Sequence, residues 1–218
     1  MPVSKECVIL LHGLARTDRS MNRLADALEK AGFFTVNYHY PSTKSTVEAL
    51  AEEEIPKALC LCPKNSKIHF VTHSMGGILV RQYLSRNTLE RLGRVVMLGP
   101  PNQGSEVVDS LKSFPGFKLI NGPAGMQLGT QKPNLPKRLP SVDFELGVIA
   151  GSRSINLILS LMLPWPNDGK VSVENTKVAG MSDHIVLPVT HPFMMRNKQV
   201  IEQVITFLKQ GAFKKHNV

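Results

Sequence analysis

A serine between a buried strand and a helix is the residue best placed to do chemistry in this sequence. Ser74 is the centre of the motif THSMG at residues 72–76, which follows the apolar residues 68–71 and precedes a helix-like stretch. A strand that turns tightly into a helix at a serine exposes the hydroxyl as a nucleophile. The turn favours small residues two positions before and after the serine, so Gly76 fits the pattern and Thr72 departs from the usual glycine.

A serine that attacks an ester or thioester needs a base to take the hydroxyl proton. We expect that base to be His191, which follows the predicted strand at residues 185–189 and precedes the last helix. This position places its ring at the carboxyl edge of a parallel sheet, where Ser74 also emerges. His184 is the rival candidate, but it precedes the same strand and would lie at the opposite edge.

The base needs a carboxylate that orients its ring, and Asp168 is the first candidate. It lies in the turn-like sequence PNDG at residues 166–169, where an aspartate without any catalytic role is also common. The residues between Asp168 and His191 leave room for one full strand between acid and base. Asp183 lies closer to His191 in the sequence and is the second candidate.

The negative charge that develops on an acyl intermediate needs two hydrogen-bond donors. One is the amide of Met75, because it begins a helix and helix N-termini carry partial positive charge. The other is expected after the first strand, where Gly13 lets the backbone turn inward and present the amide of Leu14. We interpret the histidines His12, His39, His69 and His73 as structural.

The elements that must position these residues alternate between strands and helices. Continuous apolar runs predict buried parallel strands, and apolar residues at helical spacing predict helices between them. Gly32 stands where the first helix should end. This order predicts an α/β fold with a mostly parallel sheet of about six strands and helices on both faces. The strands are expected at residues 7–11, 33–40, 67–71, 94–98, 144–150 and 185–189, and the main helices at residues 18–31, 47–58 and 200–208 and directly after Ser74.

One segment interrupts the alternation of strands and helices. Residues 102–143 contain repeated prolines and glycines and predict a long irregular excursion from the sheet. In a single domain that spans residues 1–218, such an insert is more often a functional cap than a linker. The sequence leaves open whether this cap is a mobile lid or a fixed flap.

The composition is that of an ordinary globular protein. Of 218 residues, 42% are hydrophobic and 20% charged, and the net charge is +9. Nucleic-acid binding is not expected, because aromatic residues are few and no recognition motif organises the basic residues. The positive charge permits weak contact with an anionic membrane surface.

The cysteines and apolar segments favour a cytoplasmic protein. Cys7, Cys60 and Cys62 cannot all pair with one another, so we expect buried free thiols rather than a disulfide framework or a metal site. No export signal is visible, and the longest mostly apolar stretch, residues 155–165, is too short to span a membrane. No group of residues has the spacing of a zinc site, and no cofactor is expected.

Four motifs together resemble the small α/β-hydrolase-fold lipases and esterases of bacteria. These motifs are VILLHGL at residues 8–14, THSMGG at residues 72–77, NDG at residues 167–169 and THPF at residues 190–193. The chain looks like a minimal form of that fold. The resemblance implies that Ser74 is the nucleophile, Asp168 the acid, His191 the base, and Leu14 and Met75 the donors of the oxyanion amides.

The leading functional hypothesis is a serine hydrolase that cleaves carboxylic esters through an acyl-enzyme on Ser74. Apolar residues in the cap and in residues 155–165 favour a small-molecule ester with an apolar acyl group, although they could equally be core. An acyltransferase or a thioesterase could use the same three residues. A non-catalytic binding protein on a hydrolase fold is the alternative of a different class.

Overall fold

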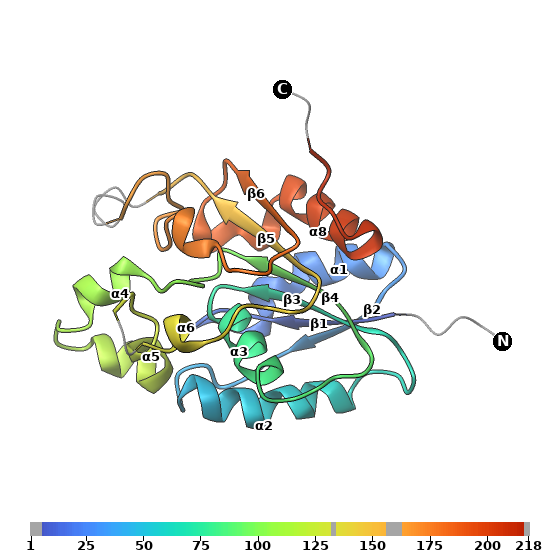
Figure 1. Ribbon diagram of the computed structural model, residues 1–218, viewed down its shortest axis with the longest axis horizontal. Helices are drawn as coiled ribbons and strands as arrows, with labels where there is room; N and C mark the ends of the chain where they lie inside the picture. Colours follow the sequence, from blue (N-terminus) through green and yellow to red (C-terminus); the bar gives the residue numbers. More distant parts are fainter. Residues whose placement is uncertain (1–5, 132–133, 156–162, 216–218) are drawn as a thin grey trace.

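One parallel sheet forms the centre of the protein (Figure 1). The structure is a computed structural model, and it describes residues 6–131, 134–155 and 163–215. The strand order in the sheet is β2-β1-β3-β4-β5-β6, and every neighbouring pair is parallel. The strands are β1 (Cys7–Leu11), β2 (Phe34–Tyr38), β3 (Ile68–His73), β4 (Leu92–Leu98), β5 (Leu146–Gly151) and β6 (Asp183–Leu187).

The inner strand β1 shows why these strands appear in the sequence as unbroken apolar runs. All five of its residues are buried, but alternate side chains enter different cores. Cys7, Ile9 and Leu11 pack on one face of the sheet, whereas Val8 and Leu10 pack on the other. A strand covered on both faces needs apolar residues at every position, as the sequence predicted.

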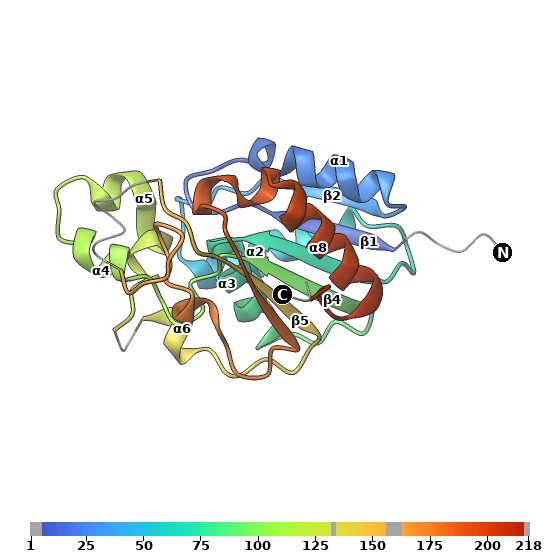
Figure 2. The same ribbon diagram turned by 90° about the horizontal axis from the view of Figure 1, so that it is seen from above.

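In the described part of the chain, two helices cover each face of the sheet (Figures 1 and 2). Helices α2 (Val47–Cys60) and α3 (Met75–Leu84) belong to one core, and α1 (Asn22–Lys30) and α8 (Lys198–Gln210) belong to the other. The predicted helix at residues 18–31 instead begins as a 3₁₀ turn at Asp18–Met21. Gly32 follows α1 with a φ of 102°, a left-handed conformation that glycine adopts without strain.

The last strand begins earlier than its sequence predicted. β6 pairs with β5 from Gly147 opposite Asp183 to Gly151 opposite Leu187, so the expected range of residues 185–189 is shifted toward the carboxyl end. β6 lies at the edge of the sheet, and its first two residues, Asp183 and His184, are polar and only partly buried, so no apolar signal marks the start of the strand. Val189 is apolar and buried although it lies beyond the end of the strand, and for this reason the predicted range extended to residue 189.

The insert at residues 102–143 is more regular than expected. It contains the helices α4 (Glu106–Leu111), α5 (Phe117–Met126) and α6 (Leu135–Arg138), and it lies beyond the carboxyl ends of the central strands (Figure 1). Its polar contacts tie it to the start of α2. The Gln127 side chain accepts a hydrogen bond from the Val47 amide at 2.8 Å and donates one to Glu48 at 2.6 Å.

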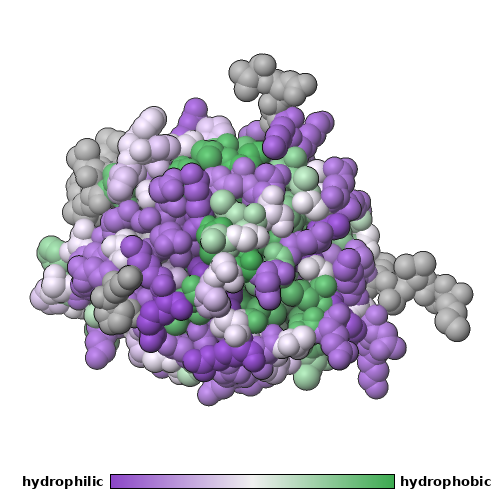
Figure 3. Space-filling model, viewed as in Figure 1, coloured by the Kyte–Doolittle hydropathy of each residue, from purple (hydrophilic) through white to green (hydrophobic). Residues whose placement is uncertain are grey.

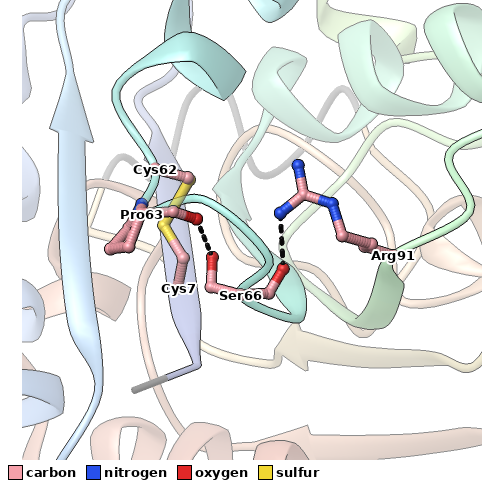
Figure 4. The surroundings of a disulfide bond; sticks show 5 residues. All are labelled: Cys7, Cys62, Pro63, Ser66 and Arg91. Atoms are coloured by element: carbon pink, nitrogen blue, oxygen red, sulfur yellow. Dashed lines mark hydrogen bonds between the residues drawn. A yellow bond between two sulfur atoms is a disulfide. The ribbon is translucent and has the colours of Figure 1, made fainter. Parts of the chain in front are cut away.

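The expectation of buried free thiols is wrong. Cys7 at the start of β1 forms a disulfide with Cys62 (Figure 4). Cys60 is a free and exposed cysteine. The disulfide connects β1 to the turn before β3, in which the Ser66 hydroxyl donates a hydrogen bond to the Pro63 carbonyl at 2.8 Å. Disulfides persist mainly in oxidising compartments, so the cysteines no longer argue for the cytoplasm.

We expect loss of this disulfide to lower the free energy of unfolding by about 2–4 kcal/mol, since the bond closes a long loop in the unfolded chain. The double substitution Cys7→Ala with Cys62→Ala would lower the melting temperature by about 5–15 °C. Cys60→Ala is the matched control and should leave it nearly unchanged. Equal melting temperatures of the wild-type protein with and without reductant would contradict the prediction.

No helix in the described part of the chain is both long and apolar enough to cross a membrane. The molecular face drawn in Figure 3 is largely hydrophilic, with apolar residues gathered in patches between hydrophilic ones. Among the described residues of the insert, the large hydrophobic side chains of Phe114, Leu119 and Ile120 are exposed.

Candidate active site

The strand order predicts a ligand-binding site at the carboxyl edge of the sheet, between β1 and β3. After β1 the chain moves to β2 on one side, and after β2 it returns to β3 on the other side of β1. The loops that leave β1 and β3 therefore diverge and open a crevice between them. Gly13 and Ser74 lie in these two loops.

Ser74 has the backbone conformation of an exposed nucleophile. Its φ is 53°, in a region that residues other than glycine rarely adopt. Its amide donates a hydrogen bond to the Leu98 carbonyl of β4 at 2.8 Å, which holds the turn in place. α3 begins at the next residue, Met75, so Ser74 lies at the positive end of a helix.

The neighbours of Ser74 explain which small residues the turn needs. A Cβ atom on Gly76 would lie 2.7 Å from the Leu11 carbonyl oxygen, so only glycine fits there. A Cβ atom on Gly77 would lie 3.2 Å from the Thr72 hydroxyl. Thr72 can therefore replace the usual glycine, because Gly77 leaves room for its side chain.

His191 and Asp168 are joined directly. His191 Nδ1 lies 2.6 Å from Asp168 Oδ2, and both side chains are buried. The His191 amide also donates to the Asp168 carbonyl at 3.1 Å. The other carboxylate oxygen, Oδ1, accepts hydrogen bonds from the amides of Lys170 at 2.9 Å and Val171 at 2.8 Å. Four hydrogen bonds thus fix the carboxylate and the ring against each other.

Ser74 and His191 line one cavity of about 310 Å³. Asp168 lies behind His191, and Gly13 and Leu14 from the loop after β1 also line the cavity. The structure therefore brings the predicted nucleophile, base and acid to one place. Most of the apolar lining comes from the insert and consists of Val107, Val108, Leu111, Phe117, Ile120 and Leu128. Of the apolar stretch at residues 155–165, residues 156–162 lie outside the described residues.

No protein-family model and no curated protein matches this sequence. Solved structures do. The mature form of lipase BlEst2 from Bacillus licheniformis aligns over 95% of this chain and 90% of that chain, with 20% identity and a TM-score of 0.67. The propeptide form aligns over 98% of this chain, with 19% identity and a TM-score of 0.73, but the match spans only 52% of that longer chain.

Two further solved structures extend the comparison. Phospholipase PlaB from Legionella pneumophila has 17% identity and a TM-score of 0.68, covering 95% of this chain and 62% of that one. Bromoperoxidase from Bacillus anthracis has 16% identity and a TM-score of 0.64, covering 95% and 93%. The chain has the α/β-hydrolase fold. Because these proteins carry different names, the likeness establishes the fold, and the chemistry must be argued from the site.

Within the α/β-hydrolase fold, the loop after β1 closes one side of the Ser74 site. A Cβ atom on Gly13 would lie 3.2 Å from Ser74 Cβ and 2.9 Å from His73 Nδ1, so the backbone approaches the serine closely. Leu14 follows at the cavity wall. On the other side the amide of Met75 belongs to the first turn of α3, where an anion is favoured.

The rival candidates do not line the cavity. Asp183 begins β6 at the opposite edge of the sheet, and its carboxylate accepts a hydrogen bond from the Phe213 amide at 2.8 Å. His184 Nε2 lies 3.0 Å from the Thr176 hydroxyl. Both residues help to attach the end of the chain and a turn to the sheet.

Gly99 is a residue of the site that the sequence analysis missed. It follows β4 with a φ of 53°, and a Cβ atom there would lie 2.9 Å from Asp168 Oδ2 and 3.0 Å from His191 Nδ1. A glycine is thus needed for the acid and base to meet. The available signal was its position directly after a strand, at the edge where Ser74 emerges.

The buried histidines have structural contacts. His73 Nε2 donates a hydrogen bond to the His191 carbonyl at 3.0 Å, and its ring lies 4.7 Å from the His191 ring between centroids. The His12 carbonyl accepts a hydrogen bond from the Tyr40 hydroxyl at 2.6 Å. Burial lowers the pKa values of His12 and His69, and burial and the nearby His191 hold the pKa of His73 well below its usual value.

We expect the free energy of unfolding to fall as the pH decreases from about 8 to about 5. In the folded protein His12, His69 and His73 take up protons at lower pH than in the unfolded chain, which protonates them near pH 6.5, because their pKa values are lowered. The unfolded state then binds more protons, and each histidine costs up to about 1.4 kcal/mol per pH unit below that point. Urea unfolding at several pH values measures the slope. A level or rising free energy toward acid pH would contradict this account.

Proposed function

We propose that the protein is a serine hydrolase that cleaves small carboxylic esters. The observation that carries the proposal is the cavity in which the strained Ser74 meets a buried His191–Asp168 pair. A serine in this turn, a histidine and a hydrogen-bonded carboxylate are the parts that acyl transfer requires. The proposed donors to the oxyanion are the amides of Leu14 and Met75.

The hydrogen bonds support a different role for each nitrogen of His191 in this proposal. Asp168 binds Nδ1 and so holds the proton there, which leaves Nε2 as the free base. In the proposed reaction Nε2 takes the proton of Ser74 Oγ while Oγ bonds to the carbonyl carbon of the ester. The carbonyl oxygen becomes negative and lies against the two amides.

Collapse of this intermediate breaks the bond to the alcohol, which leaves with the proton held by His191 Nε2. The acyl group remains on Ser74 Oγ. Water then donates a proton to Nε2 and attacks the same carbon, and the carboxylic acid leaves as Ser74 regains its proton. The apolar lining from the insert supports an apolar acyl group in this substrate.

A fluorophosphonate tests the proposal because it reacts with an activated serine hydroxyl whatever the natural substrate is. We expect one adduct per chain, which peptide mapping places on Ser74. The signal should disappear in a Ser74→Ala variant and after denaturation of the wild-type protein. A folded protein that gains no adduct, or gains it on another serine, would refute the assignment.

A further inference from the structure

The cavity holds two cations that the proposed reaction does not use. Arg16, from the loop after β1, and Lys170, two residues after Asp168, both line the cavity beside Ser74. Neither side chain forms an ion pair or a hydrogen bond with another part of the chain that the structure describes. No carboxylate of the described residues lines the cavity. Two positive charges therefore border the site, and the nearby carboxylate, that of Asp168, is already bound to His191 and offsets the charge of Lys170 only in part.

These cations lie near each other and near the reacting groups. Both side chains are exposed at the edge of the cavity. Loss of hydration beside the cavity wall, and after it the charge of Arg16, lower the pKa of Lys170, whereas the Asp168 carboxylate acts in the opposite direction. The charges of Arg16 and Lys170 also contribute to the low pKa of His73, next to Ser74. Like charges placed together in this way repel each other, and a bound anion would relieve that repulsion.

The two kinds of lining come from different parts of the chain. The insert supplies most of the apolar side chains, whereas Arg16 and Lys170 come from the loops that carry the proposed oxyanion amide and the acid. Lys170 is also fixed through its backbone, because its amide binds Asp168 and its carbonyl accepts a hydrogen bond from Ser105 at 2.7 Å. The positive charges thus come from the loops that are proposed to act on the ester, while the apolar lining suits an acyl chain.

We propose that the preferred substrate is an ester with an apolar acyl chain and an anionic alcohol part, whose phosphate or carboxylate binds between Arg16 and Lys170. This inference rests on the proposed function and adds the substrate class to it. A charge that close to the ester favours binding and also steers an anionic substrate toward the cavity. A neutral ester with the same acyl chain lacks both effects.

A series of hexanoate esters that differ only in the alcohol part tests the inference. The series is 2-hydroxyethyl hexanoate, hexanoylcholine, 3-(hexanoyloxy)propanoate and 2-(hexanoyloxy)ethyl phosphate. We expect kcat/KM to be about tenfold or more higher for the anionic esters than for the neutral one, and lowest for hexanoylcholine. The phosphate and carboxylate members show which anion the site prefers. The advantage should shrink in about 0.5 M sodium chloride.

Charge removal assigns the effect to the two residues. Arg16→Gln and Lys170→Gln should each lower the ratio of anionic to neutral kcat/KM about fivefold, and Arg16→Lys should keep most of it. Lys64→Gln is the matched control, because Lys64 is exposed before β3 at the opposite edge of the sheet. A ratio near one in the wild-type protein, or a ratio that both glutamine variants leave unchanged, would overturn the inference.

The outcome can be separated from that of the proposed function. Hydrolysis of the neutral ester that depends on Ser74, together with a ratio near one, refutes only the substrate class. Absence of all ester turnover and of the fluorophosphonate adduct refutes the hydrolase itself. In that case binding to Ser74→Ala decides whether the site selects anions: tighter binding of octyl phosphate than of octanol supports the cationic site, and equal binding rejects it.

Discussion

Substitution of Ser74 by alanine is expected to reduce kcat/KM for hexanoate esters by at least about 10⁴-fold. The variant loses the atom that bonds to the acyl carbon, and the remaining groups can only polarise the ester and orient water. Such a loss corresponds to about 5 kcal/mol or more of transition-state stabilisation. Steady-state kinetics on purified protein, with folding checked by circular dichroism, measures it.

The backbone at Ser74 offers a matched comparison. With a φ of 53°, serine and alanine are equally strained, whereas glycine is not. Ser74→Gly should therefore be as inactive as Ser74→Ala but more stable by about 1 kcal/mol. Ser85→Ala, in the residue after α3, serves as a control for loss of a hydroxyl elsewhere. A folded Ser74→Ala protein that retains a tenth of wild-type turnover would end the acyl-enzyme proposal.

Replacement of Asp168 by asparagine should lower kcat by about 10³-fold to 10⁴-fold while the protein stays folded. The amide has almost the same shape as the carboxylate, and its oxygen can still accept from the amides of Lys170 and Val171. Its NH₂ group would then face His191 Nδ1, where the proton now lies. The ring would be forced to carry its proton on Nε2, which could no longer act as a base.

Asp183→Asn is the control for this substitution, because Asp183 was the other candidate acid and does not line the cavity. The activity of the Asp183→Asn variant per folded molecule should stay within about twofold of wild type, even if a weaker hydrogen bond to the Phe213 amide lowers the stability of the protein. Full activity of Asp168→Asn, with loss in Asp183→Asn, would reverse the assignment of the acid.

Most of the sheet could be predicted because its signal is local. Each inner strand is buried on both faces, so its own residues reveal it, as in β1 and β3. The edge strand β6 is half exposed, and its limits depend on pairing with β5. Helices α4 and α6 have only six and four residues, too short to be stable without packing against the rest of the protein. For that reason the sequence predicted an irregular segment where the structure has short helices.

The positions of the candidate residues could be predicted where a local pattern defines them. Ser74 and His191 come after strands of a parallel sheet, whose carboxyl ends meet at one edge, and Asp168 lies in a turn-like sequence between two strands. Gly99 and the Cys7–Cys62 bond depend on which distant segments meet, and no local pattern reports that. Arg16 and Lys170 also looked like ordinary surface residues until the cavity brought them together.

The disulfide also determines how the molecule responds to mechanical force. Tension applied at the amino end of β1 would pass through the sulfur atoms to the turn before β3 and bypass the 55-residue separation between Cys7 and Cys62. β2, α1 and α2 would bear no load while the bond is intact. Reduction would release about 200 Å of extendable chain, since each residue spans at most about 3.6 Å. The oxidation state of Cys7 and Cys62 thus determines the length of chain that an unfolding enzyme can extend in a single step.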